Sequence, residues 1–272
     1  CMIVTTPSGL HAEHSIVSAK SGFNVLTEKP MAINLTDANK MIKEFRRLNK
    51  KLFVVKQLRF MKPFMLLKKA IEEQRFGKIY FGNFNVLWTR PQNYYDEAPW
   101  RGTFKMDGGG AFINQAIHFI DLISWFMGPI QSLYALTATQ ERNIEAEDSG
   151  VVSLKCKSGA LVTLNVNMLC YPQNFDTSVT IIGKKGTVKI GGKDLSKVET
   201  WIFEDQKDYD EDAIANIESN RGHEPLYEDV IKSLSLDIDP MVTGEEGIKS
   251  LEIISAIYKS SKSNLPIILT NN

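Results

Sequence analysis

Residues 24–30 read Asn-Val-Leu-Thr-Glu-Lys-Pro, a short apolar run that ends in a lysine and a proline. The run predicts a strand, Asn24–Thr27, which Pro30 prevents from continuing smoothly. A helix-start signal follows and predicts a helix, Leu35–Leu48. Glu28-Lys29-Pro30 therefore lies at the carboxyl end of a strand, where open α/β sheets bind their ligands. Taken alone, a Lys-Pro pair is also typical of an ordinary surface turn.

The sequence on either side repeats this alternation of strand and helix. An apolar run, Met2–Thr5, precedes a helical stretch, His11–Ser21, and another strand is predicted at Leu52–Lys56. Such alternation indicates βαβ units and a parallel sheet. Residues 1–56 are thus expected to form the carboxyl-terminal half of a Rossmann domain whose amino-terminal piece is absent. No G-x-G-x-x-G occurs, and Gly108-Gly109-Gly110 has the wrong spacing for one.

From residue 57 onward the sequence changes to strand-like segments separated by short turns, which predicts an α/β domain, 57–272, with one large, mostly antiparallel sheet. The predicted strands are Lys78–Trp88, Gln131–Thr139, Gly150–Cys156, Leu161–Leu169, Ser178–Ile182, Thr187–Ile190, Val198–Phe203 and Pro266–Leu269. The predicted helices are Pro63–Gln74, Ala111–Met127, Leu226–Leu236 and Gly244–Ser261. The acidic segment Asp205–Asn220 is expected to be solvated.

Composition narrows the classes of function. The 272 residues carry 32 basic and 32 acidic side chains, so the basic surface that nucleic-acid binding requires is not indicated. No apolar run approaches the ~20 residues that span a bilayer. The three cysteines are far apart and lack metal-ligand spacing, which favours a soluble cytoplasmic protein without a structural metal.

Polar residues follow each predicted strand of the first domain. Thr5-Thr6-Pro7-Ser8-Gly9-Leu10-His11 joins a strand to a helix, and its glycine allows close approach of a ligand to the backbone. The loop Thr5–His11 is also typical of a plain βα turn with Ser8 as a cap. Gln57 follows the third predicted strand. Together with Lys29, these loops predict one edge of a binding crevice.

The predicted helix after the triple glycine carries polar groups on one face. Asn114 and His118 are four residues apart, and Asp121 lies one turn beyond. The other residues are apolar, so the helix is expected to be buried, and a lone histidine there is commonly a satisfied core residue. The absence of His-Glu-x-x-His argues against a zinc helix.

The loop Thr89–Asp107 holds groups suited to anionic or aromatic ligands. Trp100-Arg101 combines a stacking ring with a planar cation that matches carboxylates and phosphates. Arg90, Tyr94 and Tyr95 lie upstream in the same loop. Loops of this length are commonly functional.

These motifs resemble the Gfo/Idh/MocA family over essentially the whole chain. The residues that carry the resemblance are T-P-S-G-L-H, E-K-P-M-A, Gln57–Pro63, W-R-G-T and D-G-G-G-A-F-I-N-Q-A-I-H-F-I-D-L. The combination of R-P-Q-N-Y-Y-D with W-R-G-T and N-Q-A-I-H is most similar to its UDP-N-acetyl-2-amino-2-deoxyglucuronate dehydrogenase branch, which G-H-E-P-L-Y-E-D (Gly222–Asp229) also resembles. That branch oxidises the C3 hydroxyl of a UDP-linked N-acetylated uronic acid.

The resemblance implies roles for individual residues. Lys29 and His118 are expected to flank the oxidised carbon, with His118 as the base, because imidazole titrates near neutrality, and Lys29 as the group that orients the hydroxyl. Asn114 and Tyr95 are expected to bind the substrate, with the nicotinamide edge as the alternative partner of Asn114. The residues expected to bind NAD, with NADP left open, are Ser8, Gly9, Leu10, His11, Glu28, Lys29, Gln57, Trp100 and Arg101.

Two other interpretations stay open from the sequence. Another family substrate, such as an inositol or a free hexose, would use the same fold and chemistry. A non-catalytic oligomeric binding module belongs to a different class, although the intact Lys29, Asn114 and His118 argue against it. A homo-oligomer, dimer or tetramer, is expected because Leu161–Leu169 looks apolar on both faces.

Overall fold

The amino-terminal residues form a small parallel sheet covered by helices. The computed structural model describes residues 1–192, 195, 197–214 and 222–269. Strands β1 (Met2–Val4), β2 (Val25–Thr27) and β3 (Leu52–Val54) pair in the order β1-β2-β3, all parallel. The 3-10 turn η1 (Ser8–Leu10) leads into α1 (His11–Lys20), and α2 (Leu35–Arg47) joins β2 to β3. The predicted βαβ arrangement is confirmed.

Helix α2 illustrates why these residues are helical. The Asn34 side chain accepts a hydrogen bond from the Asp37 amide at 2.8 Å and so caps the first turn. Ala38, Met41 and Phe45 recur at helical spacing and are buried, which gives the helix one apolar face for the core.

The second sheet has eight strands in the order β10-β9-β8-β4-β7-β6-β5-β11. Its strands are β4 (Ile79–Leu87), β5 (Ile130–Ala138), β6 (Ser149–Cys156), β7 (Leu161–Asn167), β8 (Asp176–Gly183), β9 (Gly186–Gly191), β10 (Lys197–Phe203) and β11 (Ile267–Ile268). All of these neighbours pair antiparallel except β4 and β7, which are parallel. The prediction of a large, mostly antiparallel sheet is therefore confirmed, with one parallel pair that makes the sheet mixed.

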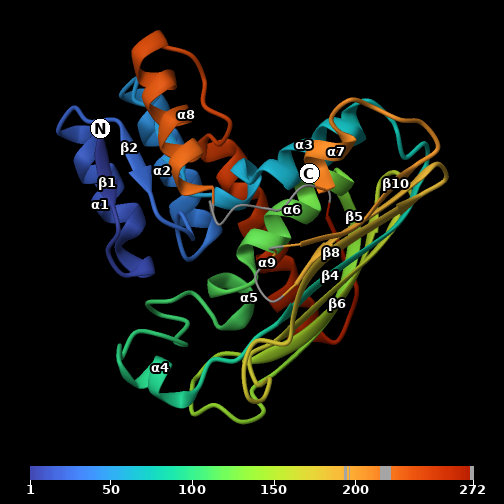
Figure 1. Cartoon of the computed structure of the whole chain (residues 1–272). Helices are drawn as coiled ribbons and strands as arrows, with labels where there is room; N and C mark the ends of the chain where they lie inside the picture. Colours follow the sequence, from blue (N-terminus) through green and yellow to red (C-terminus); the bar gives the residue numbers. More distant parts are fainter. Residues whose placement is uncertain (193–194, 196, 215–221, 270–272) are drawn as a thin grey trace.

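Two helices lie between the sheets (Figure 1). Helix α6 (Ile117–Met127) packs on β4, and α9 (Gly244–Ser263) packs on β5 and also contacts β3 and α2. The remaining helical segments are η2 (Gln57–Phe60), α3 (Lys62–Glu72), α4 (Gln92–Asp96), α5 (Ala111–Asn114), α7 (Asp210–Ile214) and α8 (His223–Leu236). None of the helices in the described ranges is long and apolar enough to cross a membrane.

Two expectations about local structure are wrong. The helix predicted at Ala111–Met127 is interrupted at Gln115 and Ala116, which separate α5 from α6. The acidic segment is not simply solvated, because Asp205 and Asp210 form ion pairs with the buried Arg75 at 2.9 and 2.6 Å. Residues 215–220 of that segment lie outside the described residues.

The outward face of β7 also differs from expectation. Its apolar residues Val162, Leu164 and Val166 are buried, and after Leu161 the outward positions are polar. The Thr163 hydroxyl donates to Asn83 on β4, and Asn165 donates to Asn83 and Asn85. Hydrogen bonds across the strands therefore satisfy a face that the sequence suggested was apolar.

Candidate active site

Three loops follow the three parallel strands at one edge of the small sheet. Ser8 lies after β1, Lys29 after β2 and Gln57 after β3. The carboxyl ends of neighbouring parallel strands share one edge, so the topology brings the three loops to the same side of the sheet.

The Lys29 amine is hydrogen-bonded to a main-chain carbonyl oxygen at the break between α5 and α6. Its Nζ donates to the Asn114 carbonyl at 2.6 Å. In a continuous helix that carbonyl would accept from the amide of His118, so the break between α5 and α6 makes it available to Lys29. Burial lowers the pKa of Lys29, while the nearby Glu28 and Asp107 carboxylates oppose this shift. The result is a half-buried lysine whose amine is fixed at the helix break.

Asp107 joins three parts of the site and was not predicted. Its Oδ1 accepts hydrogen bonds from Asn114 Nδ2 at 2.7 Å and from Ser8 Oγ at 3.4 Å, and its Oδ2 accepts one from the Gly102 amide at 3.0 Å. Burial raises the pKa of Asp107, although these hydrogen bonds favour the carboxylate. The residue therefore links the loop after β1, the W-R-G-T loop and α5.

The triple glycine makes room for a buried support of α5. A Cβ at Gly109 would lie 2.0 Å from the Tyr258 hydroxyl, and one at Gly110 would lie 2.0 Å from the Glu147 carbonyl oxygen. Glu147 Oε1 accepts from the Phe112 amide at 2.9 Å and from Tyr258 at 3.0 Å. Burial raises the pKa of Glu147 to about 7. These contacts fix the first turn of the helix that carries Asn114.

His118 is buried on the first turn of α6 and is only partly satisfied. Its Nε2 lies 3.3 Å from Gln57 Nε2, whereas its Nδ1 and Gln57 Oε1 have no hydrogen-bond partner among the described residues. Burial holds the pKa of His118 well below its usual 6.5, and the positive charges of Lys29 and Lys56 add to this effect. The ring is therefore neutral at physiological pH, with a buried nitrogen free to meet a ligand.

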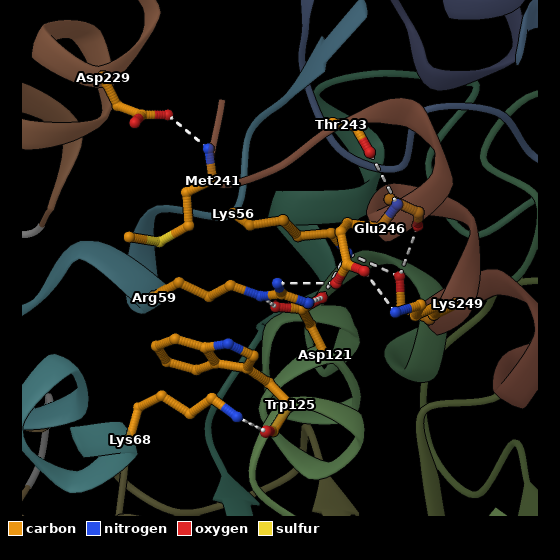
Figure 2. A network of polar contacts seen from close by, with 12 residues as sticks. Lys56, Arg59, Lys68, Asp121, Trp125, Asp229, Met241, Thr243, Glu246 and Lys249 are labelled. Carbon is orange, nitrogen blue, oxygen red and sulfur yellow. Dashed lines mark hydrogen bonds and ion pairs between the residues drawn. The ribbon is translucent and has the colours of Figure 1, made fainter. Parts of the chain in front are cut away.

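A buried ionic network lies one turn beyond His118 (Figure 2). Arg59 on η2 donates to both oxygens of Asp121 on α6, at 2.7 and 2.9 Å, and to Glu246 on α9 at 3.0 Å. Its guanidinium also lies over the Trp125 ring, 5.3 Å from the centroid. The network therefore fixes η2, which begins with Gln57, against the helix that carries His118.

Lys56 completes this network from the end of β3. Its Nζ donates to Ser250 Oγ on α9 at 2.6 Å and lies 3.7 Å from Asp121 Oδ1. Burial lowers the pKa of Lys56 to about 8, although Asp121 opposes the shift.

A hydrogen-bond chain leads from Asn114 into the aromatic loop. Gln115 Nε2 donates to Asn114 Oδ1 and to the Tyr94 hydroxyl, both at 3.0 Å. Gln115 Oε1 accepts from Arg90 Nη2 at 2.9 Å. The Asn114 amide is thus held on both sides and has one N–H left for another partner.

The sequence matches two descriptions of the same protein family. Residues 68–269 match the C-terminal alpha/beta domain of the oxidoreductase family, and residues 1–56 match its NAD-binding Rossmann fold. The chain belongs to the Gfo/Idh/MocA family. This confirms the predicted family and its fold.

Three known proteins illustrate the similarity. The chain is 45% identical to the WlbA dehydrogenase of Bordetella pertussis, solved with NADH and UDP-GlcNAcA, with a TM-score of 0.93. It is 47% identical to WlbA of Chromobacterium violaceum, solved with the same ligands, also with a TM-score of 0.93. Both alignments cover 99% of this chain, and 78% and 77% of those chains. The Thermotoga maritima myo-inositol 2-dehydrogenase is 27% identical over 95% of this chain and 76% of its own length.

The structure of this Gfo/Idh/MocA member gives two predicted cofactor residues local partners. His11 is buried, and its ring nitrogens lie 2.7 and 2.6 Å from the carbonyl oxygens of Pro30 and Thr6, so the side chain joins two loops. Glu28 accepts from the Lys29 amide at 3.1 Å.

Gly9 and Leu10 lie in η1, whereas Trp100, Arg101 and Tyr95 lie in the loop after β4. Arg101 Nη1 donates to the Tyr94 carbonyl and lies 3.3 Å from Glu97, and neither Arg101 nor Trp100 is hydrogen-bonded to Lys29 or His118. Tyr95 is buried, which raises the pKa of its hydroxyl to about 12, and Tyr94 is the tyrosine whose hydroxyl contacts Gln115. Their expected roles in binding stay predictions.

The described parts of this Gfo/Idh/MocA chain contain no group of three or more His, Cys, Asp or Glu side chains that could hold a metal ion. The missed Asp107 left one signal in the sequence, an acidic residue directly before the triple glycine. Its partners were not visible, because Ser8 and Gly102 come from separate loops.

Proposed function

We propose that this protein is an NAD-dependent dehydrogenase that oxidises the C3 hydroxyl of UDP-N-acetylglucosaminuronate to the 3-keto sugar. The observation that carries the proposal is a neutral, partly unsatisfied His118 beside a Lys29 that is fixed on the helix break. The identities of 45% and 47% to two dehydrogenases solved with NADH and UDP-GlcNAcA support the choice of substrate.

NAD would accept the hydride from C3 and would lie against the loops after β1, β2 and β3. The residues assigned to hold it are Ser8, Gly9, Leu10, His11, Glu28, Lys29, Gln57, Trp100 and Arg101. The loops after β1, β2 and β3 lie at the carboxyl edge of a parallel sheet, which is where such sheets bind dinucleotides. The end of the buried Gln57 amide that does not face His118 has no partner among the described residues, so it fits a polar ligand at the same edge.

The hydroxyl proton must leave as the hydride departs, and His118 is assigned to take it. This role requires the tautomer protonated at Nε2, with the Gln57 amide turned so that its oxygen accepts that proton. The two orientations of the amide have nearly the same shape. Nδ1 then presents a lone pair to the substrate, and Lys29 donates a hydrogen bond that orients the hydroxyl.

The test measures NADH formation by the full-length protein with a panel of nucleotide sugars, free hexoses and inositols. We expect UDP-N-acetylglucosaminuronate to give the highest kcat/KM. Preference for an inositol or a free hexose would instead support a different substrate within the family. If NAD binds but no compound is oxidised, the proposal of catalysis fails.

We also propose that the protein is a homo-oligomer that uses the outer face of its large sheet. Leu136 on β5 and Val151 on β6 are directly paired and about half exposed, beside the polar outward side chains of β7. Light scattering at micromolar concentration should give a dimer or tetramer mass. Val151→Lys should reduce this mass, whereas Met65→Lys on α3 should not. A monomer mass for the unchanged protein would refute the proposal.

A further inference from the structure

Most arginine side chains in this protein are neutralised by a carboxylate. Seven lie in the described ranges, and five of them form ion pairs at 2.6 to 3.3 Å. These five are Arg46, Arg47, Arg59, Arg75 and Arg101. Within the same ranges, Arg90 and Arg142 have no carboxylate within ion-pair distance.

The two unneutralised arginines are neighbours. Arg142 Nε donates to the Arg90 carbonyl oxygen at 2.7 Å. The nearby Asp148 carboxylate accepts from the amides of Gln140, Glu141 and Arg142 at 3.0 to 3.1 Å and from the Ser149 hydroxyl at 2.9 Å, so its hydrogen bonds are made with other groups. Neither guanidinium is therefore paired directly with a carboxylate.

The Arg90 guanidinium is held in a defined orientation. Its Cζ lies 5.0 Å from the ring centroid of Trp88 and 5.5 Å from that of Tyr94. Nη1 donates to the Thr89 carbonyl at 2.8 Å and Nη2 donates to Gln115 Oε1 at 2.9 Å. Two of its five N–H groups are thus used in these bonds, and the rings restrict the side chain without neutralising it.

The same group lies close to the proposed reaction centre. Gln115 connects Arg90 to the Asn114 side chain, and the Asn114 carbonyl receives the Lys29 amine. The positive charge of Arg90 also contributes to lowering the pKa of Lys29. A substrate whose hydroxyl meets Lys29 and Asn114 would therefore have the rest of its ring near this guanidinium.

We propose that Arg90 binds the carboxylate of the uronic acid and so determines specificity for an acidic sugar. This inference rests on the proposed function. A planar guanidinium can donate two parallel hydrogen bonds to the two oxygens of a carboxylate. A hydroxymethyl group in the same position has one oxygen and no negative charge. A phosphate of the nucleotide offers similar anionic oxygens, and the experiment is designed to separate the two sources.

The test compares Arg90→Met and Arg90→Lys with Arg47→Met, which removes an exposed arginine on α2. Three constants are measured for each full-length variant: KM for UDP-N-acetylglucosaminuronate, and the inhibition constants of UDP-N-acetylglucosamine and of UDP. UDP-N-acetylglucosamine carries a hydroxymethyl group instead of the carboxylate. We expect Arg90→Met to raise KM for the uronate about 10- to 100-fold, as for the loss of a hydrogen bond to a charged group.

The inhibition constants decide which anion Arg90 recognises. For Arg90→Met, the inhibition constants of UDP-N-acetylglucosamine and of UDP should stay within about twofold of those of the unchanged protein. Arg90→Lys should show a smaller rise in KM than Arg90→Met. Arg47→Met should change none of the three constants. If UDP also binds more weakly to Arg90→Met, the guanidinium holds the diphosphate and the carboxylate assignment is wrong. If kcat falls with KM unchanged, Arg90 acts on Lys29 rather than on the substrate, and the carboxylate assignment is wrong. If the unchanged protein does not oxidise the uronate at all, the proposed function has failed rather than this inference.

Discussion

Lys29→Ala and His118→Ala should each lower kcat by about 10²–10⁴-fold, the usual effect of losing a positioned acid–base group. Both side chains are assigned to the substrate hydroxyl, where charge moves during oxidation. Asn114→Ala should mainly raise KM, since Asn114 is assigned to holding the sugar. Turnover is measured as NADH formation at saturating substrate, and NAD affinity is measured separately by titration.

The neutral state of His118 gives this prediction a pH dependence. Its pKa lies well below 6.5 because burial and two nearby lysines disfavour the imidazolium. The base is therefore unprotonated through pH 6.5, and kcat/KM should not fall on the acid side until the pH is lower than that. The unfolded chain takes up a proton near pH 6.5 that the folded chain does not, so the free energy of unfolding should also decrease as the pH falls below 6.5. An acid limb at or above pH 6.5 would contradict the assignment.

A structural role for His118 would give a different result. The histidine lies in an apolar helix, and its removal could loosen the core. The melting temperature of His118→Ala and its affinity for NAD are therefore the controls. If the variant folds, binds NAD normally and oxidises the sugar at nearly the original rate, His118 is a buried structural residue and Lys29 acts without it.

Local patterns were sufficient to predict the elements that carry the site. The alternation of strand and helix up to residue 56 predicted three parallel strands, and turn signals predicted most strands of the large sheet. The functional loops could then be placed, because the carboxyl edge of a parallel sheet follows from chain direction alone. The parallel pairing of β4 with β7 could not be predicted, because it depends on which strands become neighbours across more than seventy residues.

The unpredicted features all depend on tertiary partners. Gln115-Ala116 contains neither glycine nor proline, so nothing in the local sequence marks a helix break there. The break leaves the Asn114 carbonyl available to the distant Lys29, and this contact is not visible in the sequence. Asp107 looked like an ordinary loop residue because its partners come from distant loops. A buried charge is favourable only when its partner is present, and a single sequence does not show which residues will meet.

Arg59→Met should be the most destabilising of the substitutions considered. Arg59 and Asp121 are each about 2% exposed at the side chain, and they form two hydrogen bonds to one another. Without Arg59, the cation that Asp121 keeps within the described ranges is Lys56 at 3.7 Å, which also contacts Ser250. Removing one partner of a buried ion pair typically costs about 3–5 kcal/mol, because the other charge stays desolvated.

The matched control is Arg46→Met, which breaks an exposed ion pair with Glu245 on the same helix α9. Exposed pairs contribute about 0–1 kcal/mol, so this variant should unfold at nearly the original urea concentration. Arg59→Met together with Asp121→Leu should recover part of the loss, because no buried carboxylate is then left without a partner. Lys56, whose pKa is already lowered to about 8, can then become neutral and keep its hydrogen bond to Ser250. Equal effects of the two single arginine variants would show that the buried pair has no special importance.

The same variants separate stability from positioning. Arg59 holds η2, which begins with Gln57, against α6, which carries His118. If this pair serves only stability, the double variant that regains stability should also regain turnover. If it positions the base, turnover should stay low in the folded double variant, because two apolar side chains cannot fix the η2–α6 geometry as a bidentate ion pair does. Turnover measured well below each variant's melting temperature distinguishes the two, since the folded fraction is then close to one in every sample.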